Sequence, residues 1–264
     1  MLERVTYSSG QNGTSCTFAH DSSRALSPSE ILFRDGQRFY GQQQFNKAVQ
    51  SWQRAVDSEQ KHGASHAFLS NMRLEGRPGV LPDVIRAFAL ASAGATVGCA
   101  HSKGALGRCL VTGAGCDKDE RRGLEIASES AAEGSCFGQF VVGRCYDYGT
   151  AQVKQDHAQA SQLYRLASAK GHAAAQINLG TMMFVEGNAA ANAEDFDEKM
   201  SKAELLFRRA AKQKNAWAEY NLGVMFEDGA GVAQDHAKAA ELFRSAAEQG
   251  HTEASKALRR LKKK

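Results

Sequence analysis

The chain has 264 residues, of which 42% are hydrophobic and 23% are charged, and its formal net charge is +4. It contains no apolar run of the about 18 residues that a membrane-spanning helix needs, and the opening MLERVTYSSGQNG lacks the apolar core of a secretory signal. We therefore expect a cytoplasmic protein, with the nucleus as the alternative compartment, and no transmembrane segment.

The N-terminal residues 1–28 are rich in Ser, Gly, Thr and Asn and poor in apolar side chains, which predicts a flexible tail. A helix is expected to begin near Ser27 and Pro28, because proline fits the first position of a helix. Residues 29–62 then carry apolar and small residues at helical spacing, which predicts one helical hairpin. These residues are Gly36, Tyr40, Phe45, Ala48, Trp52 and Ala55.

Four glycines recur inside helix-like segments, at Gly107, Gly143, Gly180 and Gly223, with separations of 36, 37 and 43 residues. Ser70 lies 37 residues before the first of them. A period near 36 is typical of stacked helical repeats, in which each hairpin packs on its neighbours. Glycine inside a helix costs about 1 kcal/mol relative to alanine, so its recurrence predicts that a neighbouring helix approaches closely at each of these positions.

The second helix of each copy carries its own markers. Asp119, Asp156 and Asp235 are expected to cap these helices. Paired small residues follow at matching places, and we expect them to face the repeated glycines. These pairs are Ala131-Ala132, Ala210-Ala211 and Ala246-Ala247. Apolar residues keep helical spacing throughout, and no stretch shows the alternation of a strand.

The last copy reads AEYNLGVMFEDGAG over residues 218–231 and KAAELFRSAAEQGH over residues 238–251. This unit resembles the Sel-one-like repeat, a branch of the tetratricopeptide superfamily, over about residues 64 to 251. The resemblance implies an all-α, right-handed α-solenoid of stacked helix-turn-helix repeats. Its expected parts are the tail (1–28), a tetratricopeptide-like hairpin (29–62), about five Sel-one-like repeats (63–251), and a basic capping helix and tail (252–264).

The same resemblance implies a non-enzymatic scaffold or adaptor that binds a peptide or protein segment along the concave face of the solenoid. The histidines recur one per copy and form no cluster, and no phosphate loop or nucleophile motif occurs, so we expect no catalytic residue, cofactor or metal. No small-molecule substrate is expected either. The partner, the pathway and the oligomeric state stay open.

Candidate partner contacts follow from aligning the copies on the repeated glycine. Arg108 and Arg144 come directly after it and are predicted to hold carboxylates of an acidic peptide. Asn178 and Asn221, two residues before it, are predicted to hydrogen-bond the peptide backbone. Apolar contact is expected from three aromatic residues, Phe137, Trp217 and Tyr220. The alternative is that the arginines are merely solvated and that Trp217 packs between repeats.

Two charged segments remain. Residues 188–200, which lengthen one repeat, are acidic and predict an inserted loop, either a contact element or a tolerated insertion. Residues 256–264 hold six positive charges and no acid, so residues 1–255 carry a net charge of −2. A binder of nucleic acid or of a membrane surface through this basic end is therefore one alternative, and a solvated cap is the simpler interpretation.

The six cysteines bear on a further alternative, because some secreted relatives of the Sel-one-like repeat are enzymes of a β-lactamase-like kind with disulfides inside each repeat. Here Cys109 and Cys145 lie 36 residues apart, and Cys99 and Cys136 lie 37 apart, so these pairs fall in adjacent hairpins. Packed helices lie about 8–10 Å apart, too far for a disulfide. We therefore expect free, buried thiols.

Overall fold

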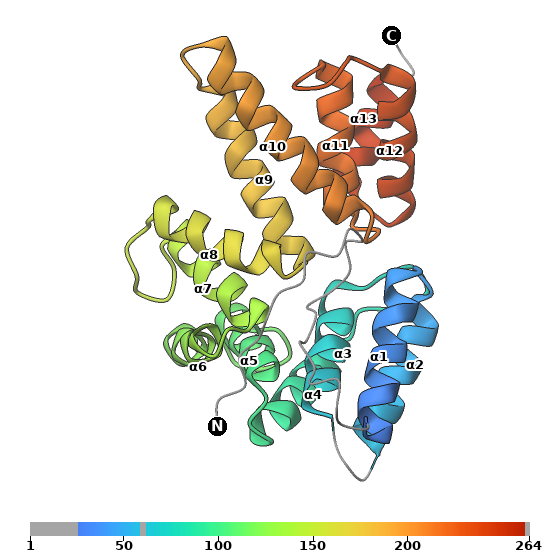
Figure 1. Ribbon diagram of the computed structural model, residues 1–264, viewed down its shortest axis with the longest axis vertical. Coiled ribbons are helices and arrows are strands. Elements are labelled where there is room, and N and C mark those ends of the chain that lie inside the picture. Colours follow the sequence, from blue (N-terminus) through green and yellow to red (C-terminus); the bar gives the residue numbers. More distant parts are fainter. Residues whose placement is uncertain (1–25, 59–61, 262–264) are drawn as a thin grey trace. The chain divides into compact units, whose positions relative to one another are not determined.

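The computed structural model describes residues 26–58 and 62–261 (Figure 1). Thirteen α-helices form in this described part, which contains no strand beyond one isolated bridge between Arg77 and Val80. The predicted all-α solenoid of stacked helical hairpins is confirmed. Most of the predicted tail, residues 1–25, lies outside the described residues, as do the last three residues of the basic end, 262–264.

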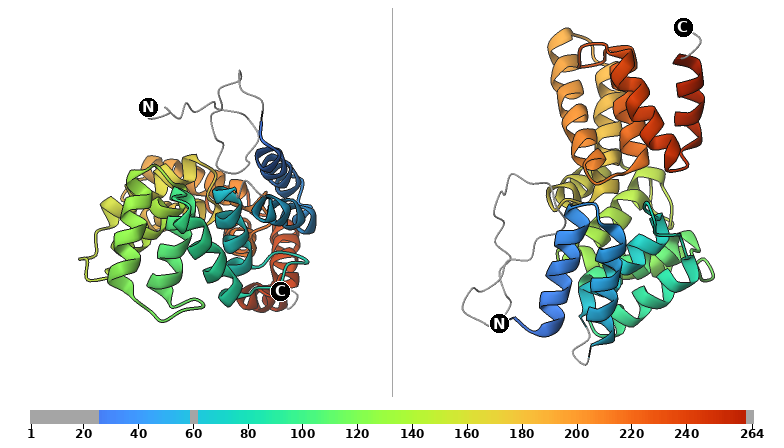
Figure 2. Two further views of the ribbon diagram at one scale, coloured as in Figure 1. Left: turned by 90° about the horizontal axis from the view of Figure 1, so that it is seen from below. Right: turned by 90° about the vertical axis from the view of Figure 1, so that its right-hand side faces the viewer.

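The chain divides into two compact units, Met1–His172 (unit 1) and Ala173–Lys264 (unit 2). Within each unit, consecutive helices run antiparallel (Figures 1 and 2). The helices of unit 1 are α1 (Pro28–Gly41), α2 (Phe45–Asp57), α3 (Gly63–Glu75), α4 (Val84–Thr96), α5 (Ala100–Thr112), α6 (Glu120–Ala132), α7 (Cys136–Tyr148) and α8 (His157–Ala169). Those of unit 2 are α9 (Ala173–Asn188), α10 (Ala193–Ala211), α11 (Ala216–Asp228), α12 (His236–Glu248) and α13 (Thr252–Leu261).

The helix ends form where the side chains predict them. Asp119, Asp156 and Asp235 each accept a hydrogen bond from the backbone N–H three residues on, so the predicted caps of α6, α8 and α12 are confirmed. Ser27 and Glu30 form a reciprocal capping box at the start of α1, with Pro28 in the first helical position. These caps define the residues at which α1, α6, α8 and α12 begin.

The repeated glycines allow close helix packing, as predicted. A Cβ atom added at Gly107 would lie 2.8 Å from the Cβ of Ala127, and one at Gly223 would lie 2.6 Å from Cε1 of Phe243. The residue that faces the glycine therefore lies about one helical turn before the paired alanines, and the prediction that the pairs themselves face it is wrong. Ala210 packs instead with Ala218 of the next hairpin.

The first hairpin shows the same principle with a larger side chain. Trp52 of α2 is fully buried and donates a hydrogen bond from Nε1 to the carbonyl of Phe33, at 3.2 Å. A Cβ atom at Gly36 would lie 2.3 Å from that nitrogen, so only glycine leaves room for the indole. The Trp52 ring also lies against Phe68 of α3, which joins this hairpin to the repeats.

The two units differ in which helices touch. In unit 1 the first helices of successive hairpins, α3, α5 and α7, contact one another directly, in addition to the contacts between consecutive helices. We call the surface that these three helices form the first-helix surface of unit 1. In unit 2 the main packing is between consecutive helices, and α9 and α10 are the longest of the described helices.

The inserted residues 188–200 are mostly helical, so the prediction of a loop is wrong for most of this segment. The helix α10 begins at Ala193, with Asn192 accepting a hydrogen bond from the N–H of Asp195 at 2.8 Å. Glu194 and Asp195 lie in its first turn, where acidic side chains interact favourably with the helix dipole. The acidic composition therefore reflects a helix start, and only residues 189–192 connect the two helices.

Candidate protein-binding site

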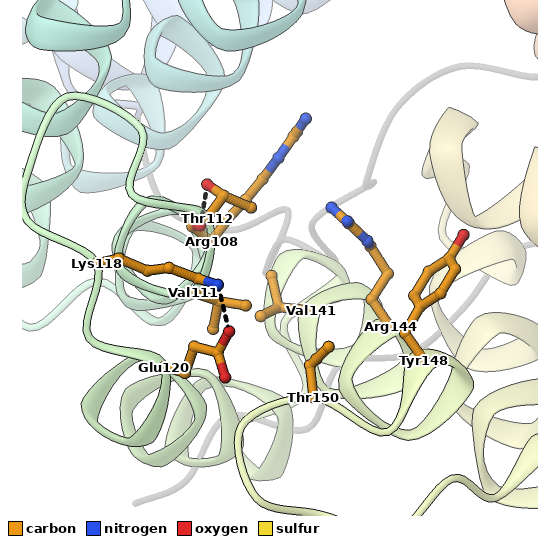
Figure 3. A pocket seen from close by; sticks show the side chains of 9 residues that line it. All are labelled: Arg108, Val111, Thr112, Lys118, Glu120, Val141, Arg144, Tyr148 and Thr150. Atoms are coloured by element: carbon orange, nitrogen blue, oxygen red, sulfur yellow. Dashed lines mark hydrogen bonds and ion pairs between the residues drawn. The ribbon is translucent and has the colours of Figure 1, made fainter.

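The two candidate arginines belong to unit 1. Arg108 on α5 and Arg144 on α7 each follow the repeated glycine, and the helical period places them at equivalent positions of adjacent hairpins. In Figure 3 their guanidinium groups extend to the same side of a pocket. The structure therefore brings these two side chains together, as expected from the repeat alignment.

Arg108 is tied to the preceding hairpin. Its Nη1 donates to Oδ1 of Asn71 at 2.7 Å and to Oε1 of Glu75 at 2.9 Å, both on α3. Arg77 donates to the other carboxylate oxygen of Glu75 at 2.6 Å. Burial alone would raise the pKa of Glu75, but the two guanidinium groups outweigh it and hold the pKa at about 2. Glu75 is therefore a permanent anion shared by two cations.

Arg144 has a different environment. Its guanidinium carbon lies 5.9 Å from the centroid of the Phe140 ring and 5.8 Å from that of Tyr148, so two aromatic rings hold the side chain. Within residues 26–58 and 62–261, no carboxylate forms an ion pair with Arg144. None of the carboxylates in those ranges thus neutralises its charge.

The pocket beside these arginines has a volume of about 290 Å³ (Figure 3). Lys118 and Glu120, at the start of α6, form an ion pair of 2.5 Å at its edge. Glu120 also accepts a hydrogen bond from the backbone N–H of Ala151 at 3.0 Å, which holds its carboxylate in place. The lining residues are Arg108, Val111, Thr112, Lys118, Glu120, Val141, Arg144, Tyr148 and Thr150.

Phe137 occupies the interior of unit 1. Its ring packs edge-on against Phe68 at 5.5 Å, His101 at 5.7 Å and His172 at 5.3 Å between centroids, and only 5% of the residue is exposed. Burial lowers the pKa of His101 and of His172 to about 4, so both rings are neutral at pH 7. Phe137 is a core residue, and its position does not suit the partner contact predicted for it.

The other four candidate residues lie on unit 2. Trp217 on α11 is 61% exposed, and its ring lies edge-on to His251 at 4.3 Å, while Tyr220 stacks on the same imidazole at 4.6 Å. Asn178 on α9 and Asn221 on α11 are half-buried. Trp217 therefore presents most of its surface to solvent, as a partner contact requires.

Several residues in or beside the unit 1 pocket were not predicted from the sequence: Asn71 and Glu75, which contact Arg108, and Lys118 and Tyr148, which line the pocket. Asn71 lies 37 residues before Arg108, one repeat earlier, so the repeat alignment contained a signal for that contact. Glu75, Lys118 and Tyr148 lie at or beyond helix ends, where the repeat pattern is weakest. Their contacts at the pocket depend on how adjacent hairpins stack, so a local sequence pattern does not predict them.

The basic C-terminal end is only partly free to meet an anion. Arg260 of α13 donates two hydrogen bonds to the Glu227 carboxylate, at 3.2 and 2.5 Å, and Lys256 pairs with Glu253 at 2.7 Å. Charges that are already neutralised contribute little to binding nucleic acid or anionic lipid. The described part of this end is thus a capping helix whose charges are largely used within unit 2.

The cysteines follow the expectation only in part. The thiols of Cys99, Cys109, Cys116 and Cys145 are free. Cys136 is disulfide-bonded, so the prediction of free thiols is wrong at that position. Burial raises the pKa of Cys109 to about 11, which keeps this thiol protonated at pH 7.

Two properties of the described residues bear on other function classes. Over 26–58 and 62–261, no group of three or more His, Cys, Asp or Glu side chains is arranged to hold a metal ion. None of the helices in those ranges combines the length and apolar character that crossing a bilayer requires.

Curated proteins similar to this chain include two from Schizosaccharomyces pombe. Chitin synthase regulatory factor 3 is 30% identical over 139 residues, which is 52% of this chain and 14% of that protein. Chitin synthase regulatory factor 1 is 30% identical over 131 residues, 50% of this chain and 28% of that protein. The chain thus spans less than a third of the length of these relatives.

Solved structures with the same fold include c5321, a protective antigen of uropathogenic Escherichia coli strains with an SLR fold. It is 28% identical, with a TM-score of 0.56 over 88% of this chain and 48% of that one. A Sel1 repeat protein from Oxalobacter formigenes is 23% identical, with a TM-score of 0.55 over 86% of this chain and 88% of that one. The second likeness shows the fold alone.

The family model of the Sel1 repeat matches five consecutive segments, 63–99, 102–135, 137–172, 173–215 and 218–251. These segments contain the hairpins from α3–α4 to α11–α12. They agree with the resemblance inferred from the repeated glycines. The chain belongs to the Sel1 repeat family.

Proposed function

We propose that this protein is a non-enzymatic adaptor that binds an acidic segment of a partner protein on the first-helix surface of unit 1. The Sel1 repeats and the similarity to regulatory factors point to a protein-interaction module. The single observation that supports the site is Arg144, a guanidinium that is held by two aromatic rings and that forms no ion pair with a carboxylate of the described residues. An acidic side chain of the partner would form an ion pair with Arg144 and neutralise its charge.

The similarity to chitin synthase regulatory factors favours a regulatory role in particular. The shared part is less than a third of those proteins. The proposal therefore takes from them only the repeat array as a binding surface and leaves chitin synthesis out. A partner segment that belongs to a regulated enzyme would be consistent with such a role.

Unit 2 supplies the second element of the proposal. Trp217 offers a large, exposed aromatic surface that His251 holds from the side, and such aromatic residues dominate the energy of many interfaces. We propose that Trp217 is an apolar anchor for a partner. Asn221 lies one helical turn further along α11 and would add hydrogen bonds to it.

The test is affinity capture of partners with the whole chain and with Arg144→Glu. We expect the variant to lose the captured partners while its melting temperature stays within about 2 °C of the parent, because the change breaks no ion pair among residues 26–58 and 62–261. Arg165→Glu is the matched control, since Arg165 is exposed on α8 and does not line the pocket. Identical partners for all three proteins would refute the site.

Charge reversal at Arg108 is unsuitable for this purpose. It would place a second carboxylate beside Glu75, whose side chain is only 13% exposed, and leave Asn71 without its donor. The resulting loss of stability would obscure any effect on binding. The two arginines therefore need separate experiments, although the repeat alignment treats them as equivalent.

A further inference from the structure

The pocket between α5 and α7 belongs to a cluster of charged side chains, some lining it and others beside it, that carries an excess of positive charge. Arg77 and Arg108 share the single carboxylate of Glu75, which leaves one positive charge uncompensated. Lys118 and Glu120 neutralise each other. Arg144, with no internal carboxylate in the described ranges, adds a second uncompensated charge. The cluster is therefore short of two negative charges.

The two guanidinium groups that face the pocket are positioned by one ring. The guanidinium carbons of Arg108 and Arg144 each lie 5.9 Å from the centroid of Phe140. Phe140 is itself buried and stacks on His172 at 4.6 Å, so it cannot move freely. Figure 3 shows both guanidinium groups on the same side, above Val141. A ligand would thus meet two donors that are already oriented.

A phosphomonoester matches this arrangement better than a carboxylate does. It carries a charge of about −1.5 to −2 at pH 7 and three acceptor oxygens, which suits two guanidinium groups that donate in planar forks. A single carboxylate would neutralise only one of the two missing charges. Two guanidinium groups around one phosphate is also a common arrangement for recognising phosphorylated side chains.

The rest of the pocket suits a peptide rather than a free anion. Val111, Val141 and Tyr148 form an apolar wall beside the charged groups. A volume of about 290 Å³ is close to the lower end of ordinary ligand pockets, enough for one phosphorylated side chain and part of its backbone. We propose that this pocket binds the phosphate of a phosphorylated Ser or Thr in the partner segment, an inference that rests on the proposed function.

The direct test uses three capped tripeptides with phosphoserine, glutamate or serine between glycines, together with inorganic phosphate. Calorimetry on the whole chain at pH 7.5 is expected to show that the phosphoserine peptide binds about tenfold or more tightly than the glutamate peptide. Equal affinity for these two peptides would overturn the phosphate proposal. Inorganic phosphate that binds as tightly as the phosphopeptide would overturn it too, since the apolar wall would then contribute nothing.

Substitution of Arg144 supplies the second arm. Arg144→Gln is expected to weaken phosphopeptide binding about tenfold or more, and Arg144→Lys to weaken it less, because lysine keeps the charge without the fork. Arg165→Gln is the matched control and should leave binding unchanged. Unchanged binding in folded Arg144→Gln, verified by its melting curve, would overturn the assignment.

Lowering the pH separates the two anions further. Phosphopeptide binding should weaken between pH 7.5 and 5.5, since the second pKa of the phosphate is about 6, whereas glutamate stays ionised. The groups around the pocket do not titrate in that range, because the pKa of Glu75 is about 2 and that of His172 is about 4. Burial alone would lower the pKa of Arg77, but the charge of Glu75 outweighs it and keeps Arg77 protonated. The hydrogen bond from Lys118 holds the pKa of Glu120 below its usual range. Binding that does not change with pH would contradict a phosphate ligand.

Phosphatase treatment distinguishes this inference from the proposed function. After phosphatase treatment of the lysate, the parent chain should fail to capture its partners, as Arg144→Glu fails to capture them from the untreated lysate. If capture depends on Arg144 but survives the phosphatase, the adaptor function stands and the phosphate proposal fails. If capture does not depend on Arg144 at all, both fail.

Discussion

Unit 1 and unit 2 are built from the same hairpin, yet two carboxylates with little solvent exposure, Glu75 of unit 1 and Glu219 of unit 2, have opposite environments. In unit 1, Glu75 is paired with two guanidinium groups that hold its pKa at about 2. In unit 2, Glu219 is buried and accepts a hydrogen bond from the amide of Gln249 at 2.7 Å, and burial raises its pKa. A repeat therefore fixes where a side chain lies, while its neighbours decide whether it is charged.

The difference extends to the histidines. In unit 1, His101 and His172 are neutral rings that lie against Phe137. In unit 2, His251 lies against the exposed Trp217, and burial lowers the pKa of His251 by a smaller amount. Unit 1 should consequently respond to acid much more strongly than unit 2. Four experiments exploit this contrast.

Acidification should have the largest effect. His101 and His172 take up protons at about pH 6.5 when unfolded but only at about pH 4 when folded, so unit 1 loses stability as the pH falls from 6.5 to 4. Each shift corresponds to about 3 kcal/mol. In unit 2 the raised pKa of Glu219 has the opposite sign and adds stability on acidification, while that of His251 removes some.

Urea unfolding at pH 7 and pH 5 checks this prediction. In a Trp217→Phe variant, Trp52 is the remaining tryptophan and reports on unit 1. Its unfolding midpoint should be clearly lower at pH 5. Replacing His172 by Gln in this variant should make the midpoint less dependent on pH. If the midpoints of the Trp217→Phe variant at pH 7 and pH 5 coincide, the neutral state of the two histidines is contradicted.

Removing the carboxylates one at a time should give the next largest contrast. Glu75→Gln leaves Arg77 and Arg108 without an anion in a buried site, which is expected to cost about 3–5 kcal/mol of unfolding free energy. Glu219→Gln keeps an acceptor for Gln249 and relieves a buried charge, so a change of less than about 1 kcal/mol is expected. Denaturant unfolding of both variants measures the difference, and similar losses would show that the two sites are equivalent after all.

Filling the repeated glycines should have a smaller effect that again differs between units. In Gly107→Ala the new methyl would lie 2.8 Å from the backbone oxygen of Gly123, which cannot move without separating the helices. In Gly223→Ala the three atoms nearest to the new methyl would all belong to the ring of Phe243. We expect a loss of about 2 kcal/mol for the first and about 1 kcal/mol for the second, after the gain in helix propensity. Thermal unfolding measures both, and a larger loss at Gly223 would contradict the argument.

The smallest effect on stability is expected from Trp217→Ala. Because 61% of Trp217 is exposed, its removal should cost less than about 1 kcal/mol of unfolding free energy. Trp52→Ala, which removes the fully buried tryptophan of unit 1, should cost about 3–5 kcal/mol. Circular dichroism melting curves provide the comparison. A large loss in Trp217→Ala would mean that this side chain supports unit 2 rather than a partner.

The sequence predicted that Arg108 and Arg144 occupy equivalent positions, but it did not predict that their environments differ. The repeat alignment placed Arg108 and Arg144 one hairpin apart, and the structure shows them beside one pocket. The alignment could not show that Glu75 takes up Arg108, because Glu75 is the last residue of α3 and the contact depends on how two hairpins stack. Phe137 was misplaced for a similar reason, since a period identifies a position but not the depth of the side chain there.

The amino-acid sequence by itself determined the all-α repeat architecture, the helix caps at Asp119, Asp156 and Asp235, and the close approach at each repeated glycine. These features are local, because they depend on backbone hydrogen bonds and on side chains a fixed number of residues apart. Only the tertiary structure decided which charges are neutralised and which rings are buried. Burial and ion pairing depend on residues about 30 positions apart in the chain, and their energies are set by the distances and solvent exposure that stacking creates.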